Sequence, residues 1–265
     1  MTTGALTGTS AEPRLDVWSE RELRDFNENG FAVVRGLLDP SELAELKRHL
    51  PDVLSGSDDD GMHRERERSG AVRQVYLAHR HSPVFRALAH SRKVAGPAQQ
   101  ILGDEVYIWH SKINVKDALE GTVWLWHQDY GYWTLDGVDP QIVSVMILLD
   151  RATINNGSLM VVPGSHRWGM LDHYSDTVTT SYKQWCIKPE VLRGKLREEQ
   201  IQYVTGEPGD ALFFDCNLVH GSGHNMSPLP RNTFIVAYNS IRNKPRPTSD
   251  PRPDWVVSRE FEIVR

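Results

Sequence analysis

Residues 124–133 of the chain read WLWHQDYGYW and place an imidazole and a carboxylate two positions apart, at His127 and Asp129. Side chains at positions i and i+2 of a strand point to the same face, so both groups can approach one metal ion. Such pairs are also common on protein surfaces. The pair therefore predicts a metal site only in combination with a third ligand from elsewhere in the chain.

Short segments of strand character lie on both sides of this stretch. They are rich in Val, Ile, Met and aromatic residues, are separated by Gly, Pro, Asn and Asp, and cover residues 106–115, 121–127, 142–149, 158–162, 202–204, 211–214 and 233–240. This pattern favours an antiparallel sandwich or barrel over alternating βαβ units. Asn156-Gly157 predicts a hairpin turn between two of the strands.

Helical signals are concentrated before residue 103. Ser19 with Glu22 forms a capping-box pattern, and Asp39 before Pro40 marks a second helix start, with a short strand expected over 31–36 between the two helices. Two short packed helices are expected over 83–102. Residues 55–70 are so polar that a mobile, solvated loop is the simpler interpretation. The functional alternative is a lid over the site. Residues 169–199 are interpreted as an insertion between strands.

The composition is that of an ordinary globular protein. The chain has 265 residues, of which 39% are hydrophobic and 25% charged, and its net charge of -5 gives no general attraction for nucleic acid or anionic membrane. Cys186 and Cys216 are too few for a disulfide framework, which favours reduced thiols and a cytoplasmic enzyme. We find neither a secretion signal nor a membrane span. Residues 1–14 are expected to be a disordered arm before a single domain over 15–265.

The third ligand candidate is His220, which follows the strand at 211–214. In a closed or two-sheet β fold, strands that are distant in sequence become neighbours, so His220 can join His127 and Asp129. Two His and one carboxylate with open positions opposite them is the ligand set of non-haem Fe(II) oxygenases. Arg231 begins the next apolar strand, and its fixed guanidinium fork suits a carboxylate ligand.

With these residues in place, the chain resembles the phytanoyl-CoA hydroxylase (PhyH) family of Fe(II)/2-oxoglutarate-dependent dioxygenases from about residue 20 to residue 240. The resemblance also rests on residues 29–36, 155–166 and 206–210 and on the run 220–223. It implies a mostly β fold with flanking helices, a double-stranded β-helix (jelly roll, cupin-like). Residues 110–114 and the spacing from His127 to Trp133 are most similar to the bacterial branch that hydroxylates ectoine and free leucine.

The resemblance implies a role for each matching residue. His127, Asp129 and His220 are the catalytic iron ligands, and the cofactors are Fe(II), 2-oxoglutarate as co-substrate and O₂. The residues implied to bind 2-oxoglutarate are Arg231, Ser222, Asn114 and Ser144. Related halogenases have a small residue in place of the carboxylate, so Asp129 favours hydroxylation.

Four residues are expected to contact the substrate: His110, Lys112, Tyr132 and Trp133. For His110, a core histidine bonded to the backbone is an equal alternative. Lys112 is either a solvated strand residue or a partner for a substrate carboxylate. Trp133 and Tyr132 are expected to form apolar walls, although an aromatic residue at a strand end is often core. The ectoine branch has Gln and Arg at the positions of His110 and Lys112, so a different small substrate is expected.

The predicted function is hydroxylation of an aliphatic C–H of a small amino acid or amino-acid-like natural-product intermediate, with succinate and CO₂ as co-products. Desaturation, cyclisation or epoxidation of a larger secondary metabolite would use the same ligands. A catalytically silent β-barrel binding module is the non-enzyme alternative, and it predicts a damaged ligand set, whereas this set is complete. The expected partner is a small molecule, with no nucleic acid and no membrane. His79 and His173 have no partner spacing that indicates a metal and are expected at the surface or in loops.

Overall fold

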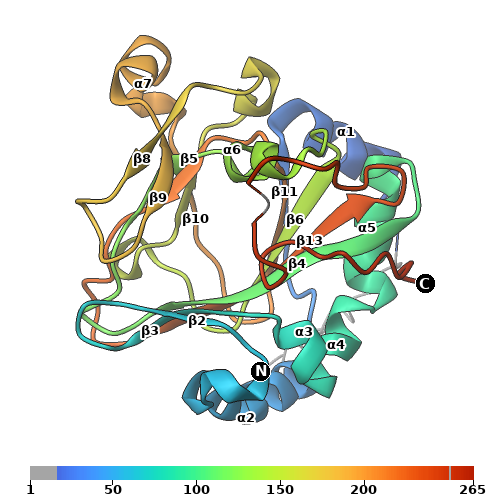
Figure 1. Ribbon diagram of the computed structural model, residues 1–265, viewed down its shortest axis with the longest axis vertical. Helices are drawn as coiled ribbons and strands as arrows, with labels where there is room; N and C mark the ends of the chain where they lie inside the picture. Colours follow the sequence, from blue (N-terminus) through green and yellow to red (C-terminus); the bar gives the residue numbers. More distant parts are fainter. Residues whose placement is uncertain (1–16, 251) are drawn as a thin grey trace, which may run out of the picture.

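The structure is a computed structural model that describes residues 17–250 and 252–265, so the expected arm at 1–14 lies outside the described residues. Two antiparallel sheets form its centre (Figure 1). The larger has the order β1-β11-β6-β13-β4-β3-β2 and the smaller has the order β10-β7-β12-β5. Their bounds are β1 Phe31–Val34, β2 Arg64–Arg66, β3 Val72–Tyr76, β4 Val106–Lys116, β5 Trp124–His127, β6 Ile142–Leu148, β7 Leu159–Val161, β10 Gln202–Val204, β11 Ala211–Asp215, β12 His220–Ser222 and β13 Arg231–Ser240.

Helices cover the outer face of the seven-stranded sheet. Phe26, Leu46, Phe85 and Val94 come from four different helices and pack with the strand residues that point the same way, among them Ile113. Figure 1 shows α5 on this side of the sheet and β5, β8 and β9 on the other. The helices are α1 Glu20–Asn29, α2 Pro40–Ser55, α3 Ala78–His81, α4 Pro83–Ala89, α5 Arg92–Leu102, α6 Asp129–Trp133 and α7 Pro189–Lys195, with 3-10 turns η1 Asp58–Asp60, η2 Thr134–Asp136, η3 Ile154–Asn156, η4 Ser165–Trp168 and η5 Glu198–Gln200.

A second apolar layer fills the space between the two sheets. Met146 and Leu212 from the larger sheet contact the cluster that contains Leu159 and Val161 from the smaller one. Because side chains alternate along a strand, each central strand of the larger sheet serves both layers, as β6 does with Val145 outward and Met146 inward. The double-stranded β-helix expected from the resemblance is confirmed.

The helix start signals are confirmed in atomic detail. Ser19 and Asp39 both accept a hydrogen bond from the backbone N–H three residues on, and the carboxylates of Glu22 and Glu42 accept one from the backbone N–H of the cap residue. The two helices expected over 83–102 are α4 and α5. Cys186 and Cys216 are both free and buried, as expected of reduced thiols. In the described part of the chain, we find no helix of sufficient length and apolarity for a membrane span.

The sequence-based interpretation of residues 55–70 as a loop is wrong for its second half. Residues 64–66 form β2, which pairs with β3. Together β3 and β2 extend the larger sheet by two strands beyond β4. Arg64 and Glu67 are buried, because the charges of this run are satisfied internally: Arg64 by Asp60 and Glu67 by Arg73. A run of charged residues carries no apolar alternation, so its strand could not be recognised from the pattern.

The hairpin expectation is corrected, and the expected insertion has structure of its own. Asn156-Gly157 does not turn a hairpin, because β6 and β7 belong to different sheets and Gly157 instead ends the 3-10 turn η3 with a φ of 71°. The insertion at 169–199 contains a two-stranded sheet, β8 His173–Asp176 paired with β9 Gln184–Ile187. This hairpin lies against the open edge of the smaller sheet, where the Gln184 side chain accepts a hydrogen bond from the backbone N–H of Leu125.

Candidate metal centre and active site

Three ligand groups converge between the two sheets. His127 ends β5, Asp129 begins α6, and His220 begins β12 directly opposite His127 in the strand pairing. The Nε2 atoms of both imidazoles lie 3.9 Å from Oδ1 of Asp129, and one ligand atom from each residue falls within 4.8 Å of the others. All three side chains are buried. The distant His220 thus joins the His-x-Asp pair as the sequence predicted.

Each imidazole is held with one nitrogen free for a metal. Nδ1 of His127 lies 2.6 Å from the carbonyl oxygen of Leu125, and Nδ1 of His220 lies 2.9 Å from that of Leu218. A carbonyl can only accept, so both Nδ1 atoms donate their protons and leave Nε2 with its lone pair. Burial lowers the pKa of both imidazoles, which keeps them neutral and ready to bind a cation.

The carboxylate is charged and fixed in orientation. Burial would raise the pKa of Asp129, but electrostatic interactions, the largest of them with the charged Lys112, outweigh it and lower that pKa to about 2. The hydroxyl of Ser144 donates to Oδ2 of Asp129 at 3.0 Å, which leaves Oδ1 toward the imidazoles. Two neutral imidazoles and one carboxylate fit a divalent first-row metal such as Fe(II). Ser144 was predicted to contact the co-substrate, and the structure places it instead behind the ligand Asp129.

The turn between His127 and Asp129 is anchored by residues that the sequence did not single out. Nε2 of His173 accepts a hydrogen bond from the backbone N–H of Gln128, and the Gln128 amide bonds the carbonyls of Gly169 and Asn217. A Cβ on Gly131 would lie 2.6 Å from the His173 ring, so only glycine fits there. His173 is therefore a buried positioning residue and not the surface residue that we expected.

A first cavity, called here the inner cavity, lies on one side of the ligands and has the character of an anion site. Its volume is about 30 Å³, and it is lined by His127, Asp129 and His220 together with Asn114, Ser222, Thr233 and Arg231. Asn114 and Thr233 are paired across β4 and β13, which puts both on the face directed toward the smaller sheet. Ser222 Oγ, Asn114 Oδ1 and Thr233 Oγ1 have no hydrogen-bond partner although all are buried.

Arg231 is the clearest sign of a missing ligand in the inner cavity. Its side chain is 4% exposed, and no carboxylate among the described residues forms an ion pair with it. Burial lowers its pKa to about 10, so the guanidinium remains charged at neutral pH. A buried, unpaired cation is costly in free energy, and a dianionic ligand would remove that cost. The predicted 2-oxoglutarate residues Arg231, Ser222 and Asn114 therefore come together beside the metal ligands.

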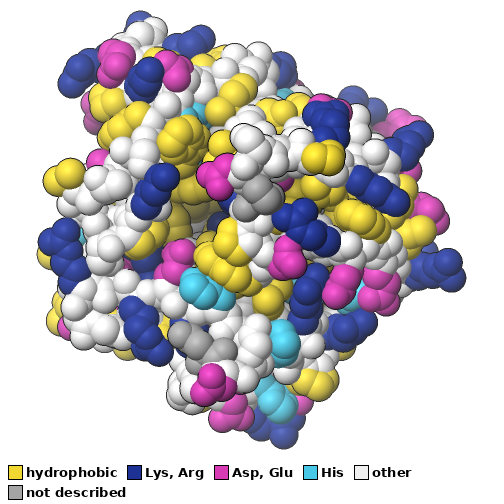
Figure 2. Space-filling view, viewed as in Figure 1, with side chains coloured by type: hydrophobic (Ala, Val, Ile, Leu, Met, Phe, Trp, Pro, Cys, Tyr) yellow, Lys and Arg dark blue, Asp and Glu magenta, His cyan; other side chains and the backbone are white. Residues whose placement is uncertain are grey.

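A second cavity, called here the outer cavity, opens on the other side of the ligands. It has a volume of about 70 Å³ and is bordered by all four predicted substrate residues, His110, Lys112, Tyr132 and Trp133. Figure 2 shows this face hollowed near its centre, with hydrophobic groups and charges of both signs around the depression. The lining further includes Trp124, from the expected strand 121–127, and residues from segments that the sequence had left as loops or had not assigned: Glu65, Gln74, Tyr76, Tyr182, Lys183, Arg252 and Val256.

His110 fits both of the interpretations that the sequence left open. Its Nδ1 donates to the carbonyl of Val256 at 3.0 Å, as a core histidine would, while its ring lines the outer cavity. Burial lowers its pKa to about 3, so the ring is neutral and its Nε2 is an acceptor, which has no partner among the described residues. Lys112 lies between the two cavities with its ammonium 5.8 Å from the centre of the Trp124 ring.

Comparisons with known proteins agree with this geometry. Residues 26–233 match the family described as Phytanoyl-CoA dioxygenase (PhyH). The chain belongs to the phytanoyl-CoA dioxygenase family. It is 34% identical to an ectoine dioxygenase of Bordetella bronchiseptica over 94% of this chain and 86% of the relative, and 33% identical to one of Nocardia farcinica over 95% and 92%.

Solved structures show the same relationship. EctD from S. alaskensis, crystallised with 2-oxoglutarate and 5-hydroxyectoine, superposes with a TM-score of 0.80 at 31% identity, covering 93% of this chain and 86% of that one. The same enzyme has been crystallised with bound Fe. A carbocyclase, SnoK, from nogalamycin biosynthesis matches with a TM-score of 0.67 at 21% identity, which shows the shared fold alone.

The resemblance that the sequence predicted is thereby confirmed. This member of the phytanoyl-CoA dioxygenase family is a non-haem Fe(II)/2-oxoglutarate-dependent dioxygenase. Its buried His-Asp-His set fits the iron, and the uncompensated Arg231 fits the co-substrate. The complete ligand set is not that of a catalytically silent binding module.

Proposed function

We propose that the enzyme hydroxylates an aliphatic carbon of a small amino acid or amino-acid-like natural-product intermediate. The observation that carries the proposal is that one set of side chains, His127, Asp129 and Lys112, borders both cavities. A molecule in the outer cavity therefore lies against the metal face, while the inner cavity holds the co-substrate near Arg231. The relatives named ectoine dioxygenases support a small zwitterionic substrate.

When bound, iron would supply the oxidising chemistry, in which the four-electron reduction of O₂ is coupled to oxidation of 2-oxoglutarate to succinate and CO₂ and to hydroxylation of the substrate, two electrons each. The protein's own residues bind and orient. His127, Asp129 and His220 would hold the metal, Arg231 with Ser222 and Asn114 would bind the distal carboxylate of 2-oxoglutarate, and Trp133 and Tyr132 would exclude water from the reacting carbon. Asp129, a carboxylate and not a small residue, supports hydroxylation over halogenation.

The relatives that the chain matches over most of its length are named ectoine dioxygenases, which supports a small substrate over a larger secondary metabolite. His110 and Lys112 stand where the ectoine branch has Gln and Arg, so we place ectoine itself within a wider panel of candidates.

Residues 15–265 are proposed to act as a single catalytic domain. The outer cavity takes Glu65 from the first quarter of the chain and Arg252 from its last fifteen residues, so both ends are needed for one site. The partner is proposed to be the small molecule alone, since a net charge of -5 gives no general attraction for nucleic acid or an anionic membrane. A cytoplasmic location is proposed from the two unpaired thiols.

Anaerobic titration tests the proposed cofactors. Fe(II) and 2-oxoglutarate added to the apoprotein should produce a visible metal-to-ligand charge-transfer band, and His220→Ala or Asp129→Ala should each abolish substrate-dependent succinate release. Folded protein without a band would overturn the assignment. The substrate class is tested by screening free amino acids and ectoine for stimulation of succinate release, with a larger aromatic metabolite as the contrasting probe. Stimulation by the larger metabolite alone would overturn the small-substrate proposal.

A further inference from the structure

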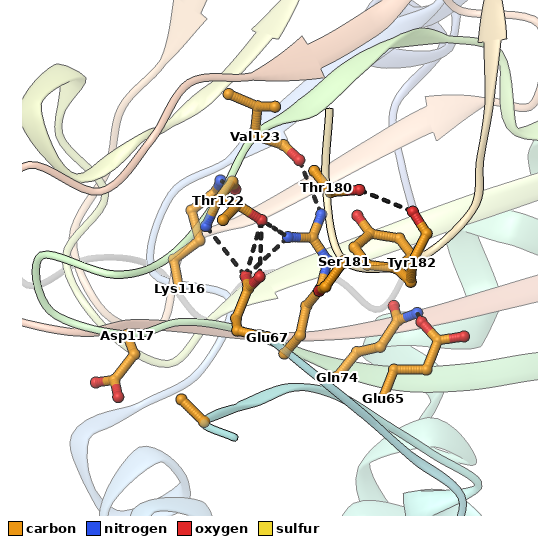
Figure 3. Close-up of polar contacts among 12 residues, drawn as sticks. Glu65, Glu67, Gln74, Lys116, Asp117, Thr122, Val123, Thr180, Ser181 and Tyr182 are labelled. Carbon is orange, nitrogen blue, oxygen red and sulfur yellow. Dashed lines mark hydrogen bonds and ion pairs between the residues drawn. The ribbon is translucent and has the colours of Figure 1, made fainter. Parts of the chain in front are cut away.

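One wall of the outer cavity contains hydrogen-bond acceptors that lack donors. It is built by the strands at the β2 edge of the larger sheet, where Glu65 pairs with Gln74 and Gln74 pairs with Asn114. Residues paired in this way lie on the same face, so the row from Glu65 to Asn114 is directed toward the space beside the metal ligands. Glu65 and Gln74 both line the cavity, and Figure 3 shows their side chains next to each other.

The hydrogen bonds of Gln74 fix the orientation of its amide. The amide nitrogen donates one hydrogen to Glu65 Oε2 and the other to the hydroxyl oxygen of Tyr76, at 2.8 Å in the second case. The opposite orientation would set the amide oxygen against the carboxylate, so it is excluded. Consequently Gln74 Oε1 is an acceptor, and it is buried without a hydrogen-bond partner.

The carboxylate of Glu65 interacts electrostatically with Arg73, but no ion pair joins it to Lys or Arg in the described part of the chain. Arg252, which lines the same cavity, already uses its Nε and Nη2 on the buried Asp136. Among the described residues, the side-chain hydrogen bond to the half-buried Glu65 comes from Gln74, reaches Oε2 and leaves Oε1 available.

A third acceptor lies in the same cavity wall. His110 gives its single ring proton to Val256, and its Nε2 is buried without a donor. Gln74 Oε1 and His110 Nε2 are therefore buried acceptors without a donor in the lining of one cavity, and the half-buried Glu65, with no bond to its Oε1 among the described residues, lines the same cavity. Buried polar atoms are normally paired, so a ligand with several N–H groups is the complementary occupant.

We propose that Glu65 is a specificity-determining residue that binds a cationic nitrogen of the substrate, an ammonium or amidinium group, with Gln74 and His110 accepting its remaining N–H bonds. This inference rests on the proposed function, which it deepens by stating the charge that the substrate must carry in the outer cavity. In a zwitterionic substrate, the carboxylate would be bound by the lysines that line the same cavity, Lys112 and Lys183.

The test compares four forms of the holoenzyme: wild type, Glu65→Gln, Glu65→Asp and the control Glu190→Gln, which alters an exposed glutamate on α7. Each is loaded anaerobically with Fe(II) and 2-oxoglutarate and titrated by calorimetry. The probes are ectoine, the twenty protein amino acids and the Nα-acetyl derivatives of those amino acids. Thermal unfolding confirms that each variant is folded, and Glu65→Asp keeps the charge should the Gln variant lose stability.

The best-binding probes should carry a cationic nitrogen. Acetylation of that nitrogen, or Glu65→Gln, should weaken binding about ten- to hundredfold, the range for a hydrogen bond to a charged group, while Glu65→Asp retains the preference and Glu190→Gln changes nothing. Equal affinity in Glu65→Gln and wild type, equal affinity for free and acetylated probes, or no binding of any probe would each overturn the inference. A missing charge-transfer band before probes are added overturns the proposed function instead.

Discussion

Arg231 and His79 show how single buried groups determine which ligand this protein can bind and the pH range in which it is stable. Both are polar, both are almost fully buried, and they solve the problem of burial differently. Arg231 remains charged and lacks an anion, so its burial is relieved only by a ligand. His79 gives up its charge, because burial lowers its pKa, and its Nδ1 lies 2.6 Å from the hydroxyl of Ser111, which also accepts from the His79 backbone N–H.

Replacing Arg231 should weaken the binding of 2-oxoglutarate without lowering the stability of the protein. Arg231→Met removes the guanidinium but keeps an apolar stem, so we expect 2-oxoglutarate affinity to fall about ten- to hundredfold, as for loss of a charged hydrogen bond, with Fe(II) binding intact. The apoprotein should lose no stability, because an unpaired buried charge disappears. Titration of the charge-transfer band and thermal unfolding measure the two effects. Unchanged 2-oxoglutarate affinity would remove Arg231 from the anion site.

The stability of the apoprotein should decrease at acidic pH because of His79. Burial and the nearby Arg80 lower its pKa to about 3, against 6.5 for the ordinary group. Because the unfolded chain then binds the proton first, stability is complete above about pH 6.5 and is lost as the pH falls toward 3, by about 1.4 kcal/mol per pH unit. His79→Gln keeps a hydrogen-bonding group without this titration and should reduce the loss.

Denaturant unfolding at several pH values checks this prediction. Carboxylates also contribute to acid unfolding, so the comparison is between the slopes of wild type and variant. His224→Gln, at an exposed histidine, serves as the control and should leave the slope as in the wild type. A slope between pH 6.5 and 4 that is the same in all three proteins would contradict the assignment.

At the scale of elements, the β2–β3 hairpin connects the cavity wall to the rest of the active site. The guanidinium of Arg73 on β3 lies between the rings of Trp124 and Tyr182, at 4.1 and 4.0 Å from their centres, and bonds the carbonyl of Val123 at 2.8 Å. Glu67 completes the cluster with bonds to Arg73 and Thr122, as Figure 3 shows for Glu67 and Thr122. Trp124 and Tyr182 both line the outer cavity.

Breaking the ion pair between Arg73 and Glu67 should strongly destabilise the protein, since both side chains are at most 5% exposed. Arg73→Met leaves Glu67 as a buried, uncompensated charge, and we expect a loss of about 3–5 kcal/mol in the free energy of unfolding. Adding Glu67→Gln to that variant should restore part of the loss. Urea denaturation measures both, with the exposed Arg66→Met as the matched control. A loss below about 1 kcal/mol in Arg73→Met would show that the cluster is not structural.

At the scale of the whole molecule, the metal face unites two elements that are adjacent in sequence, β5 and α6, with the distant β12. His127 and His220 are paired across β5 and β12, and Asp129 follows at the start of α6. A metal bound by all three ligands binds the folded chain and not the unfolded one, so it must stabilise the fold.

Fe(II) should therefore raise the unfolding temperature under anaerobic conditions. At a free concentration one hundred times its Kd, the gain is about 2.7 kcal/mol, which corresponds to roughly 5–10 °C for a chain of this length. A chelator should reverse the shift, and His220→Ala should abolish it. Differential scanning calorimetry at fixed protein concentration measures the shift. An equal shift in His220→Ala would place the stabilising metal elsewhere.

The sequence alone determined the features that are carried by short patterns. The capping boxes at Ser19 and Asp39, the central strands, the His-x-Asp pair, His220 and Arg231 are each defined by residue types at fixed spacing, and their local physics differs little between contexts. The jelly-roll fold and the cofactors followed from this set through the family resemblance, and the comparisons confirm both.

Only the tertiary structure decided the environment of the WLWHQDYGYW stretch. Glu65 and Gln74 come from segments without apolar periodicity, Arg252 from the C-terminal segment, and His173 from a two-stranded insertion, and all four reach the active site through contacts across the sheets. The physical reason is that charged and polar side chains, unlike apolar ones, leave no periodic signal in sequence. Their partners, and therefore the charge that the outer cavity presents to a substrate, exist only once distant strands have paired.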